Sequence, residues 1–132
     1  GADGWQLSNP PIMALAPLRV SLEIFRRAGM ARLREKSVQL TGYLEWLVHT
    51  QLNDLLQVVT PADPERRGAQ LSIRVTAGRE RGRSLFDHLM TQGIIGDWRE
   101  PDVIRISPVP LYNRFADCLA FAQAVQAWER AG

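Results

Sequence analysis

The residue best suited to chemistry in this sequence is Arg105, which lies in the segment 102–113. Alternation along a β-strand places Ile104 and Ile106 on one face and turns Arg105 to the other. A guanidinium held on a strand can bind a carboxylate through two parallel charge-assisted hydrogen bonds. The same pattern is also typical of an edge-strand arginine that prevents aggregation or pairs with a neighbouring acid. The residues alone leave both interpretations open.

A second candidate is the segment 4–12, in which Ser8 and Asn9 precede Pro10 and Pro11. The two prolines restrict the backbone and remove two amide donors. A stiff backbone can hold a hydroxyl and an amide at the edge of a binding site. An ordinary capped turn would have the same composition, so the function of this segment stays open as well.

The remaining polar residues form no recognisable catalytic group. The sequence contains no glycine-rich phosphate loop, no Cys/His array at metal-ligand spacing and no nucleophile elbow. His49 and His88 have no partner at ligand spacing, and Cys118 falls in an apolar helical stretch, which favours a small buried filler. We therefore expect no metal site and no catalytic residue in this chain.

The charge balance argues against a nucleic-acid or membrane partner. Fifteen arginines and one lysine face 14 acidic residues, and the arginines are scattered. The local cluster of Arg79, Arg81 and Arg83 is interrupted by an acid and is expected to be a solvated turn. No apolar run approaches the ~20 residues that span a bilayer. The single cysteine excludes an internal disulfide and suits a reducing compartment.

The elements that must position these residues follow from periodicity. Apolar residues at spacings of three and four predict helices at 12–27, 30–51, 84–92 and 114–130. Alternating or short apolar runs predict strands at 56–60, 70–76, 94–98 and 103–106. With 132 residues and 45% hydrophobic content, this order predicts an α/β fold. We expect a two-layer sandwich in which helices cover a small, mainly antiparallel sheet.

Polar residues predict where some elements begin, end or face solvent. Ser84 is expected to cap the third helix, Gly93 to end it, and Asn113 to cap the fourth. Lys36 and Glu45 are assigned to the solvent-facing side of the second helix. The chain starts without methionine, directly before an ordered-looking motif, so we expect it to be a piece of a longer protein.

Several motifs, in order and over nearly the whole sequence, resemble the kynureninase family. The two specific ones are Ser8-Asn9-Pro10-Pro11-Ile12 and Pro108-Val109-Pro110-Leu111-Tyr112-Asn113. Weaker matches lie at 22–25, 33–37, 40–45 and 65–73. The resemblance implies a homodimeric, cytoplasmic fold type I enzyme that uses pyridoxal 5'-phosphate. Kynureninases hydrolyse L-kynurenine or 3-hydroxykynurenine to the corresponding anthranilate and L-alanine in tryptophan catabolism.

The resemblance also implies roles for individual residues. Arg105 stands where the family places the arginine that grips the substrate α-carboxylate. Asn9 matches an asparagine near the cofactor and the substrate, Ser8 is assigned to the aromatic end of the pocket, and Trp5 to packing. In this family the lysine that binds the cofactor and most phosphate contacts lie upstream, in a large domain. Lys36, the only lysine here, resembles an ordinary surface position.

These roles divide the chain into a leading loop, residues 1–11, and a C-terminal small domain, residues 12–132. Without the large domain, the chain is expected to be inactive by itself. Two alternatives remain open. One is a non-catalytic binding module that keeps the small-domain fold, and the other is a different fold type I enzyme, such as a cysteine desulfurase-like protein.

Overall fold

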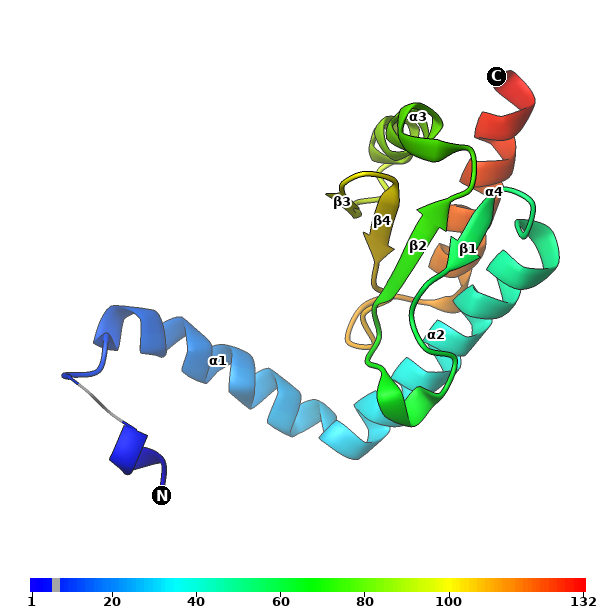
Figure 1. The fold of residues 1–132 in the computed structure, drawn as a ribbon. Coiled ribbons are helices and arrows are strands. Elements are labelled where there is room, and N and C mark those ends of the chain that lie inside the picture. The colour runs from blue at the N-terminus through cyan, green and yellow to red at the C-terminus, as the bar shows by residue number, and fades with distance from the viewer. Residues whose placement is uncertain (6–7) are drawn as a thin grey trace. The chain divides into compact units, whose positions relative to one another are not determined.

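The computed structural model describes residues 1–5 and 8–132, which form two compact units (Figure 1). Unit 1 comprises Gly1–Leu33 and unit 2 comprises Arg34–Gly132. Unit 1 contains the short helix η1 (Ala2–Trp5) and the longer helix α1 (Ile12–Ala28). Unit 2 contains the whole sheet and the helical residues after position 33, so it is the part of the chain that positions Arg105.

Helix α1 forms where the apolar spacing predicts it, with Pro17 inside it. Gly29 ends the helix at a φ of +84°, a conformation that favours glycine, and its N–H donates to the carbonyl of Phe25 at 2.9 Å. None of the side chains described in α1 is buried. Its exposed large apolar residues are Ile12, Met13, Leu15, Leu18, Val20, Leu22 and Ile24.

Helix α2 (Met30–Gln51) has the bounds that the sequence predicts. Within unit 2, Leu40, Leu44, Leu47 and Val48 form its apolar stripe, and each is at most 2% exposed. Fully burying a leucine or valine side chain stabilises a fold by roughly 1.5–3 kcal/mol. This stripe therefore fixes α2 against the rest of unit 2.

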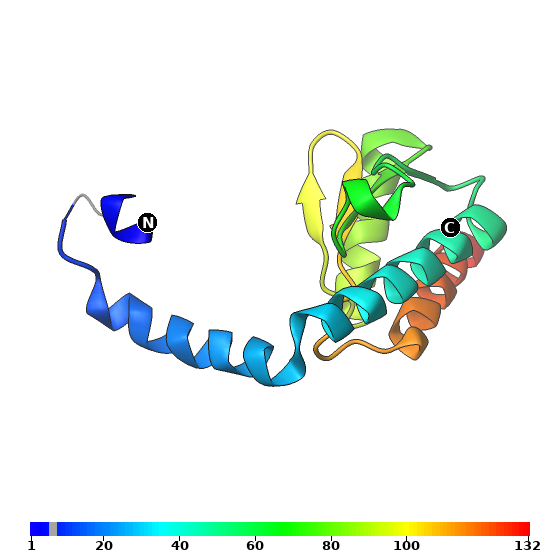
Figure 2. The ribbon, with the colours of Figure 1, turned by 90° about the horizontal axis from the view of Figure 1, so that it is seen from below.

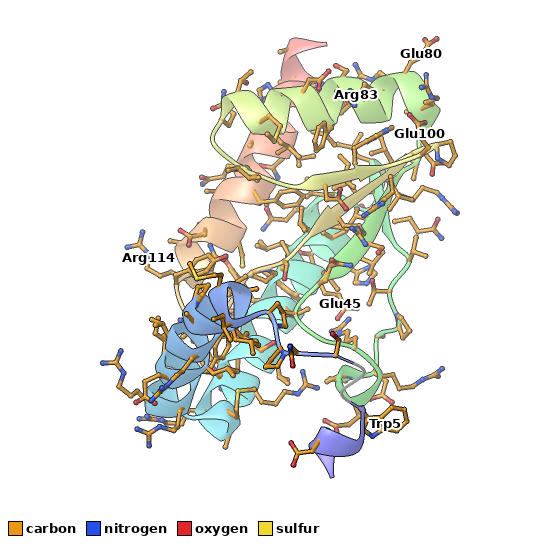
Figure 3. The ribbon with its side chains drawn as sticks, turned by 90° about the vertical axis from the view of Figure 1, so that its left-hand side faces the viewer. Trp5, Glu45, Glu80, Arg83, Glu100 and Arg114 are labelled. Atoms are coloured by element: carbon orange, nitrogen blue, oxygen red, sulfur yellow. The ribbon has the colours of Figure 1, made fainter. Side chains whose placement is uncertain are left out.

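The solvent-facing assignment of Glu45 on α2 is wrong. Its side chain is only 14% exposed and accepts hydrogen bonds from both terminal nitrogens of Arg67, at 2.8 and 2.6 Å. The loop between the first two strands brings Arg67 over α2, and helical periodicity carries no information about such a loop. Figure 3 labels Glu45 among the side chains of unit 2.

Four short strands form one antiparallel sheet. They are β1 (Leu56–Val58), β2 (Leu71–Val75), β3 (Asp97–Arg99) and β4 (Val103–Ile106). Their order across the sheet is β1-β2-β4-β3, so β4 is an interior strand. β3 starts later than the predicted position 94, because the N–H of Ile94 donates to the carbonyl of Leu89 and closes the preceding helix instead.

Helices α2, α3 (Gly78–Thr91) and α4 (Phe115–Ala131) cover one face of this sheet (Figures 1 and 2). The predicted two-layer α/β sandwich with an antiparallel sheet is therefore confirmed. Side chains from the sheet and from all three helices share one core. Its members include Leu40, Leu47, Leu71, Ile73, Val75, Leu85, Leu89, Ile104, Phe121 and Val125.

Helix α3 begins at Gly78, not at Ser84, so the prediction of a solvated turn at residues 79–83 is wrong. Two ion pairs hold this first part of the helix: Arg79 with Glu100 at 2.9 Å and Arg81 with Glu129 at 2.7 Å. Figure 3 shows Glu80 and Arg83 on α3 and Glu100 at the turn that follows β3. These contacts come from distant parts of the chain, so the local sequence does not reveal them.

Two small residues of α3 serve packing. Gly82 is buried, and a Cβ atom added there would lie 3.1 Å from the ring of Trp98, so the missing side chain allows β3 to approach the helix. Ser84 does not cap the helix as predicted. Its Oγ instead accepts a hydrogen bond from Nε1 of Trp128 on α4 at 3.1 Å. Gly93 follows the helix at a φ of +74°, in agreement with its predicted stop position.

Candidate functional site

Arg105 lies on the face of the sheet opposite the core. Ile104 and Ile106 are 3% and 7% exposed, whereas the Arg105 side chain is 32% exposed. The alternation predicted for 103–106 is therefore confirmed. The alternative interpretation is wrong about the edge strand, because β4 pairs with β2 on one side and with β3 on the other. Its pairing of Arg105 with a neighbouring acid is confirmed.

The acidic partner of Arg105 is Asp97 on β3. The register places Asp97 directly across from Arg105, and Nε of Arg105 donates to Oδ2 of Asp97 at 2.6 Å. Nη2 of Arg105 donates to the same oxygen. Arg99 adds a third hydrogen bond to Oδ2, from its Nε at 2.9 Å. The hydrogen bond from Arg105, aided by that from Arg99, holds the pKa of Asp97 below its ordinary value of 3.8.

The open face of the sheet carries more positive than negative charge. Its charged side chains are three arginines, Arg74, Arg99 and Arg105, and two acids, Asp97 and Asp102. Nε of Arg74 lies 3.5 Å from Oδ1 of Asp102, and Asp97 pairs with both other arginines. Three cations and two anions leave an excess of one positive charge. Such a surface attracts an anion, and its guanidinium groups suit a carboxylate.

The loop that follows β4 is fixed by one side chain from α2 and by one from the loop itself. Nζ of Lys36 on α2 donates to the carbonyl of Pro110 at 2.8 Å, so Lys36 is a half-buried structural residue and its surface assignment is wrong. Oδ1 of Asn113 accepts from the N–H of Val109 at 2.8 Å. Arg114, not Asn113, occupies the N-cap position of α4. The loop is therefore a stiff continuation of the strand that carries Arg105.

A hollow of about 340 Å³ lies beside this loop. Arg105 is not among the described residues that line it. Cys118 lines it from α4, but the thiol is 3% exposed and burial raises its pKa to about 11. A thiol with such a pKa stays protonated at neutral pH, so Cys118 is the buried filler that the sequence predicts and not a nucleophile.

Ser8 and Asn9 belong to unit 1, and both are exposed in the chain as described. Arg105 belongs to unit 2, so the joint site of these three residues stays a prediction. Trp5 is 87% exposed in this chain, so its assignment to packing also stays a prediction (Figure 3). Gln6 and Leu7 of the same motif lie outside the described residues.

Residues 1–5 and 8–132 contain neither a metal-binding cluster nor a membrane-spanning helix. Within these ranges, no group of three or more His, Cys, Asp or Glu side chains could hold a metal ion. No helix within the same ranges combines the length and apolarity needed to cross a bilayer. His49 lies on α2 with its side chain 60% exposed, 3.9 Å from Glu45.

Sequence reasoning identified Arg105 but missed Asp97. Asp97 falls inside a predicted strand, and Arg105 in the next one, so a hairpin between them could have suggested the pair. The register of that hairpin is fixed by the turn between its strands, and the predicted strand ends at 98 whereas β3 continues to Arg99. A one-residue error in register turns a side chain to the other face of the sheet.

Comparison with known proteins agrees with the motifs described above. The sequence profile of the kynureninase C-terminal domain matches residues 33–125. A kynureninase from Xanthomonas euvesicatoria pv. vesicatoria is 65% identical over 131 residues, which cover 99% of this chain and 31% of that protein. A kynureninase from Stenotrophomonas maltophilia is 64% identical over 128 residues, 97% of this chain and 30% of that protein. The chain thus spans about a third of the length of these relatives, and it belongs to the kynureninase C-terminal domain family.

Proposed function

We propose that this chain forms the C-terminal part of a kynureninase and binds the α-carboxylate of its amino-acid substrate. The complete enzyme would hydrolyse L-kynurenine or 3-hydroxykynurenine to the anthranilate and L-alanine. Identities of 64–65% to two proteins named kynureninase support this activity. Bound pyridoxal phosphate would supply the electron sink for breaking the carbon–carbon bond.

The observation that carries the proposal is the position of Arg105. Its guanidinium is half-buried on an interior strand, on a face with an excess of one positive charge. A rigid strand holds a bidentate donor more accurately than a loop does. The role of Arg105 in this chain is then to bind and orient the substrate, because a bidentate pair fixes both the position and the plane of a carboxylate.

Ser8 and Asn9 are proposed to meet the same substrate from the leading loop. Asn9 has an amide that can both donate and accept hydrogen bonds near the cofactor, and Ser8 has a hydroxyl suited to the aromatic end of the substrate. Pro10 and Pro11 restrict the backbone directly after them. The proposal divides the chain into a leading loop, residues 1–11, and a small domain, residues 12–132, which starts where α1 begins at Ile12.

The residue that binds the cofactor covalently is proposed to lie in the remaining two thirds of the enzyme. Lys36 does not fit this role, because its ammonium group is half-buried and donates to the carbonyl of Pro110 at 2.8 Å. The chain alone should therefore be inactive. Incubation with pyridoxal phosphate, borohydride reduction and mass spectrometry should find no stoichiometric modification at Lys36, and a stoichiometric one would contradict the proposal.

The assembly and location are proposed on the same basis. A kynureninase of this kind would act as a homodimer in the cytoplasm, where the buried thiol of Cys118 would stay reduced. Light scattering of the complete enzyme measures its oligomeric state. A monomer at micromolar concentration that retains full activity would contradict the dimer.

Enzyme kinetics test the proposed function. In what we call the hybrid enzyme, this chain replaces the matching residues of the Xanthomonas euvesicatoria relative, with which it aligns over 131 residues. We expect the hybrid enzyme to cleave kynurenine and Arg105→Ala to lower kcat/KM by roughly 100-fold or more, as expected when a charged hydrogen-bonding partner is lost. Arg83→Ala removes a half-exposed arginine of α3 and serves as the control. Equal kinetics for Arg105→Ala and Arg83→Ala would refute the carboxylate-binding role.

A further inference from the structure

We infer that Asp97 is a positioning residue, which holds one edge of the Arg105 guanidinium so that the other edge meets the substrate carboxylate. This inference rests on the proposed function of Arg105 and adds a second residue to it. The sequence motifs do not single out Asp97. Its assignment comes from the sheet register and from the hydrogen bonds on the open face.

The first step of the argument is which guanidinium atoms are already used. Nε and Nη2 of Arg105 both donate to Oδ2 of Asp97, and these two atoms form the side-on edge of the group. A guanidinium has five N–H donors arranged so that a second edge, made by Nη1 and Nη2, can also bind a carboxylate. In the described part of the chain, Nη1 of Arg105 donates to no acceptor. The end-on edge is therefore available.

The second step is why Asp97 does not occupy that edge itself. Asp97 and Arg105 are direct cross-strand neighbours, so their Cβ atoms are fixed about 5 Å apart by the sheet. A side chain as short as aspartate reaches only the near edge of the guanidinium from this position. The sheet thus fixes Asp97 on one side of Arg105 and leaves the other side to a ligand.

The third step is the charge balance. Oδ2 of Asp97 also accepts from Nε of Arg99 at 2.9 Å, so one carboxylate serves two guanidinium groups. The hydrogen bond from Arg105 lowers the pKa of Asp97, which keeps this carboxylate ionised at neutral pH. Because Asp97 cancels only one of the two positive charges, the pair Arg99 and Arg105 still attracts an anion.

The fourth step decides between a positioning and a merely stabilising role. The side chains of Asp97 and Arg105 are 48% and 32% exposed, and ion pairs this accessible to water contribute little to stability. The binding of a ligand depends far more strongly than stability on the orientation of the guanidinium, because a displacement of about 1 Å in a binding group can reduce a rate by roughly 100-fold. The loss of Asp97 should therefore affect ligand binding more than folding.

The test uses the hybrid enzyme and two non-reacting substrate analogues, one with the α-carboxylate and one with a carboxamide in its place. We expect Asp97→Asn to raise the dissociation constant of the carboxylate analogue roughly 10-fold and to leave that of the carboxamide unchanged. Glu129→Gln is the matched control, because Glu129 is a 43% exposed carboxylate paired with Arg81 at 2.7 Å, remote in sequence from Arg105. Unchanged or tighter binding of the carboxylate analogue by Asp97→Asn would overturn the inference.

A double mutant shows whether Asp97 acts through Arg105. Asp97→Asn should have no further effect when Arg105 is already alanine, whereas two independent contributions would add. Additive effects would overturn the inference, while Arg105→Ala with unchanged carboxylate binding would overturn the proposed function itself.

Thermal unfolding of each variant shows whether β3 remains folded. If Asp97→Asn unfolds, Asp97→Glu provides the second comparison, because it keeps the charge. We expect Asp97→Glu to bind the carboxylate analogue with an affinity between those of the unmodified enzyme and Arg105→Ala. The longer side chain of Asp97→Glu displaces the carboxylate along the guanidinium. If this variant bound the analogue as tightly as the unmodified enzyme does, the inference would also be overturned.

Discussion

Helices α1 and α4 are both 17 residues long and both rich in apolar side chains, but only one of them has a buried face. α4 buries Cys118, Phe121, Ala122, Val125 and Trp128, whereas no side chain described in α1 is buried. The apolar spacing predicts both helices equally well. The comparison shows that periodicity identifies a helix and its apolar side without identifying the surface that covers that side. Most helical stability in proteins comes from such packing.

Units 1 and 2, which contain α1 and α4, also differ at the starts of these helices and in their ion pairs. The N–H of Arg114 donates to Oδ2 of Asp117 at 2.9 Å at the start of α4, whereas α1 follows Pro11 without a side-chain cap. Each unit contains a bidentate Arg–Glu pair that can be compared, Arg26–Glu23 in α1 and Arg67–Glu45 in unit 2. In α1, Glu23 and its partner are exposed, and in unit 2 Glu45 and its partner are nearly enclosed. The same chemical pair therefore has different surroundings, which makes the comparison testable.

The largest expected effect comes from placing a charge on each helix. Val125 is fully buried in α4, so Val125→Asp would enclose an unpaired carboxylate and lower the free energy of unfolding by roughly 3–5 kcal/mol. Leu18 is 49% exposed in α1, and Leu18→Asp should change that free energy by less than about 1 kcal/mol. Urea unfolding followed by circular dichroism measures both. Similar losses in the two variants would show that α1 is packed as tightly as α4.

A smaller effect is expected from breaking the two bidentate pairs. Glu45→Gln leaves Arg67, whose side chain is 5% exposed, without its counter-charge, and should lower the free energy of unfolding by about 1–3 kcal/mol. Glu23→Gln removes the partner of Arg26 on the exposed surface and should leave the thermal midpoint unchanged. Differential scanning calorimetry compares the variants. A shift for Glu23→Gln as large as that for Glu45→Gln would contradict the contrast between the regions.

The smallest expected effect concerns acid. Hydrogen bonds from the Arg114 backbone and then from the Asn113 side chain lower the pKa of Asp117 below 3.8. Because the folded pKa is lower than the unfolded one, this carboxylate stabilises the fold above the unfolded value and loses its contribution as pH falls through the folded value. Asp117→Asn should therefore reduce the loss of stability below about pH 4. Unfolding midpoints of the unmodified chain and of Asp117→Asn, measured at and below about pH 4, test this role of Asp117. A parallel loss of stability in the two proteins would disprove it.

Much of the fold could be predicted because it depends on local patterns. The bounds of α2 and β4 follow from apolar spacing and strand alternation, and the same alternation turns Arg105 away from the core. The start of α3 could not be predicted, because Gly78 and Gly82 have low helix propensity and interrupt the good helix formers of residues 79–81. Packing of Gly82 against Trp98 and the Arg79–Glu100 ion pair stabilise that turn from elsewhere in the chain.

In the candidate site, too, local patterns could be predicted and long-range contacts could not. The sequence reveals a guanidinium with a suitable direction, but it does not reveal which neighbour holds it. Asp97 reaches Arg105 only through the register of β3 and β4. Similarly, helical periodicity predicts Lys36 to be a surface residue, whereas in the structure the loop after β4 places the Pro110 carbonyl beside it. Long-range partners of charged side chains are what the sequence leaves undetermined.

The central claim is that the free edge of Arg105 binds the substrate carboxylate, and a crystal structure of the hybrid enzyme with the carboxylate analogue tests it most directly. We predict that the two carboxylate oxygens lie about 2.7–2.9 Å from Nη1 and Nη2 of Arg105, while Asp97 keeps its hydrogen bonds to Nε and Nη2. A carboxylate bound to other residues, with Arg105 paired to Asp97 alone, would contradict the claim.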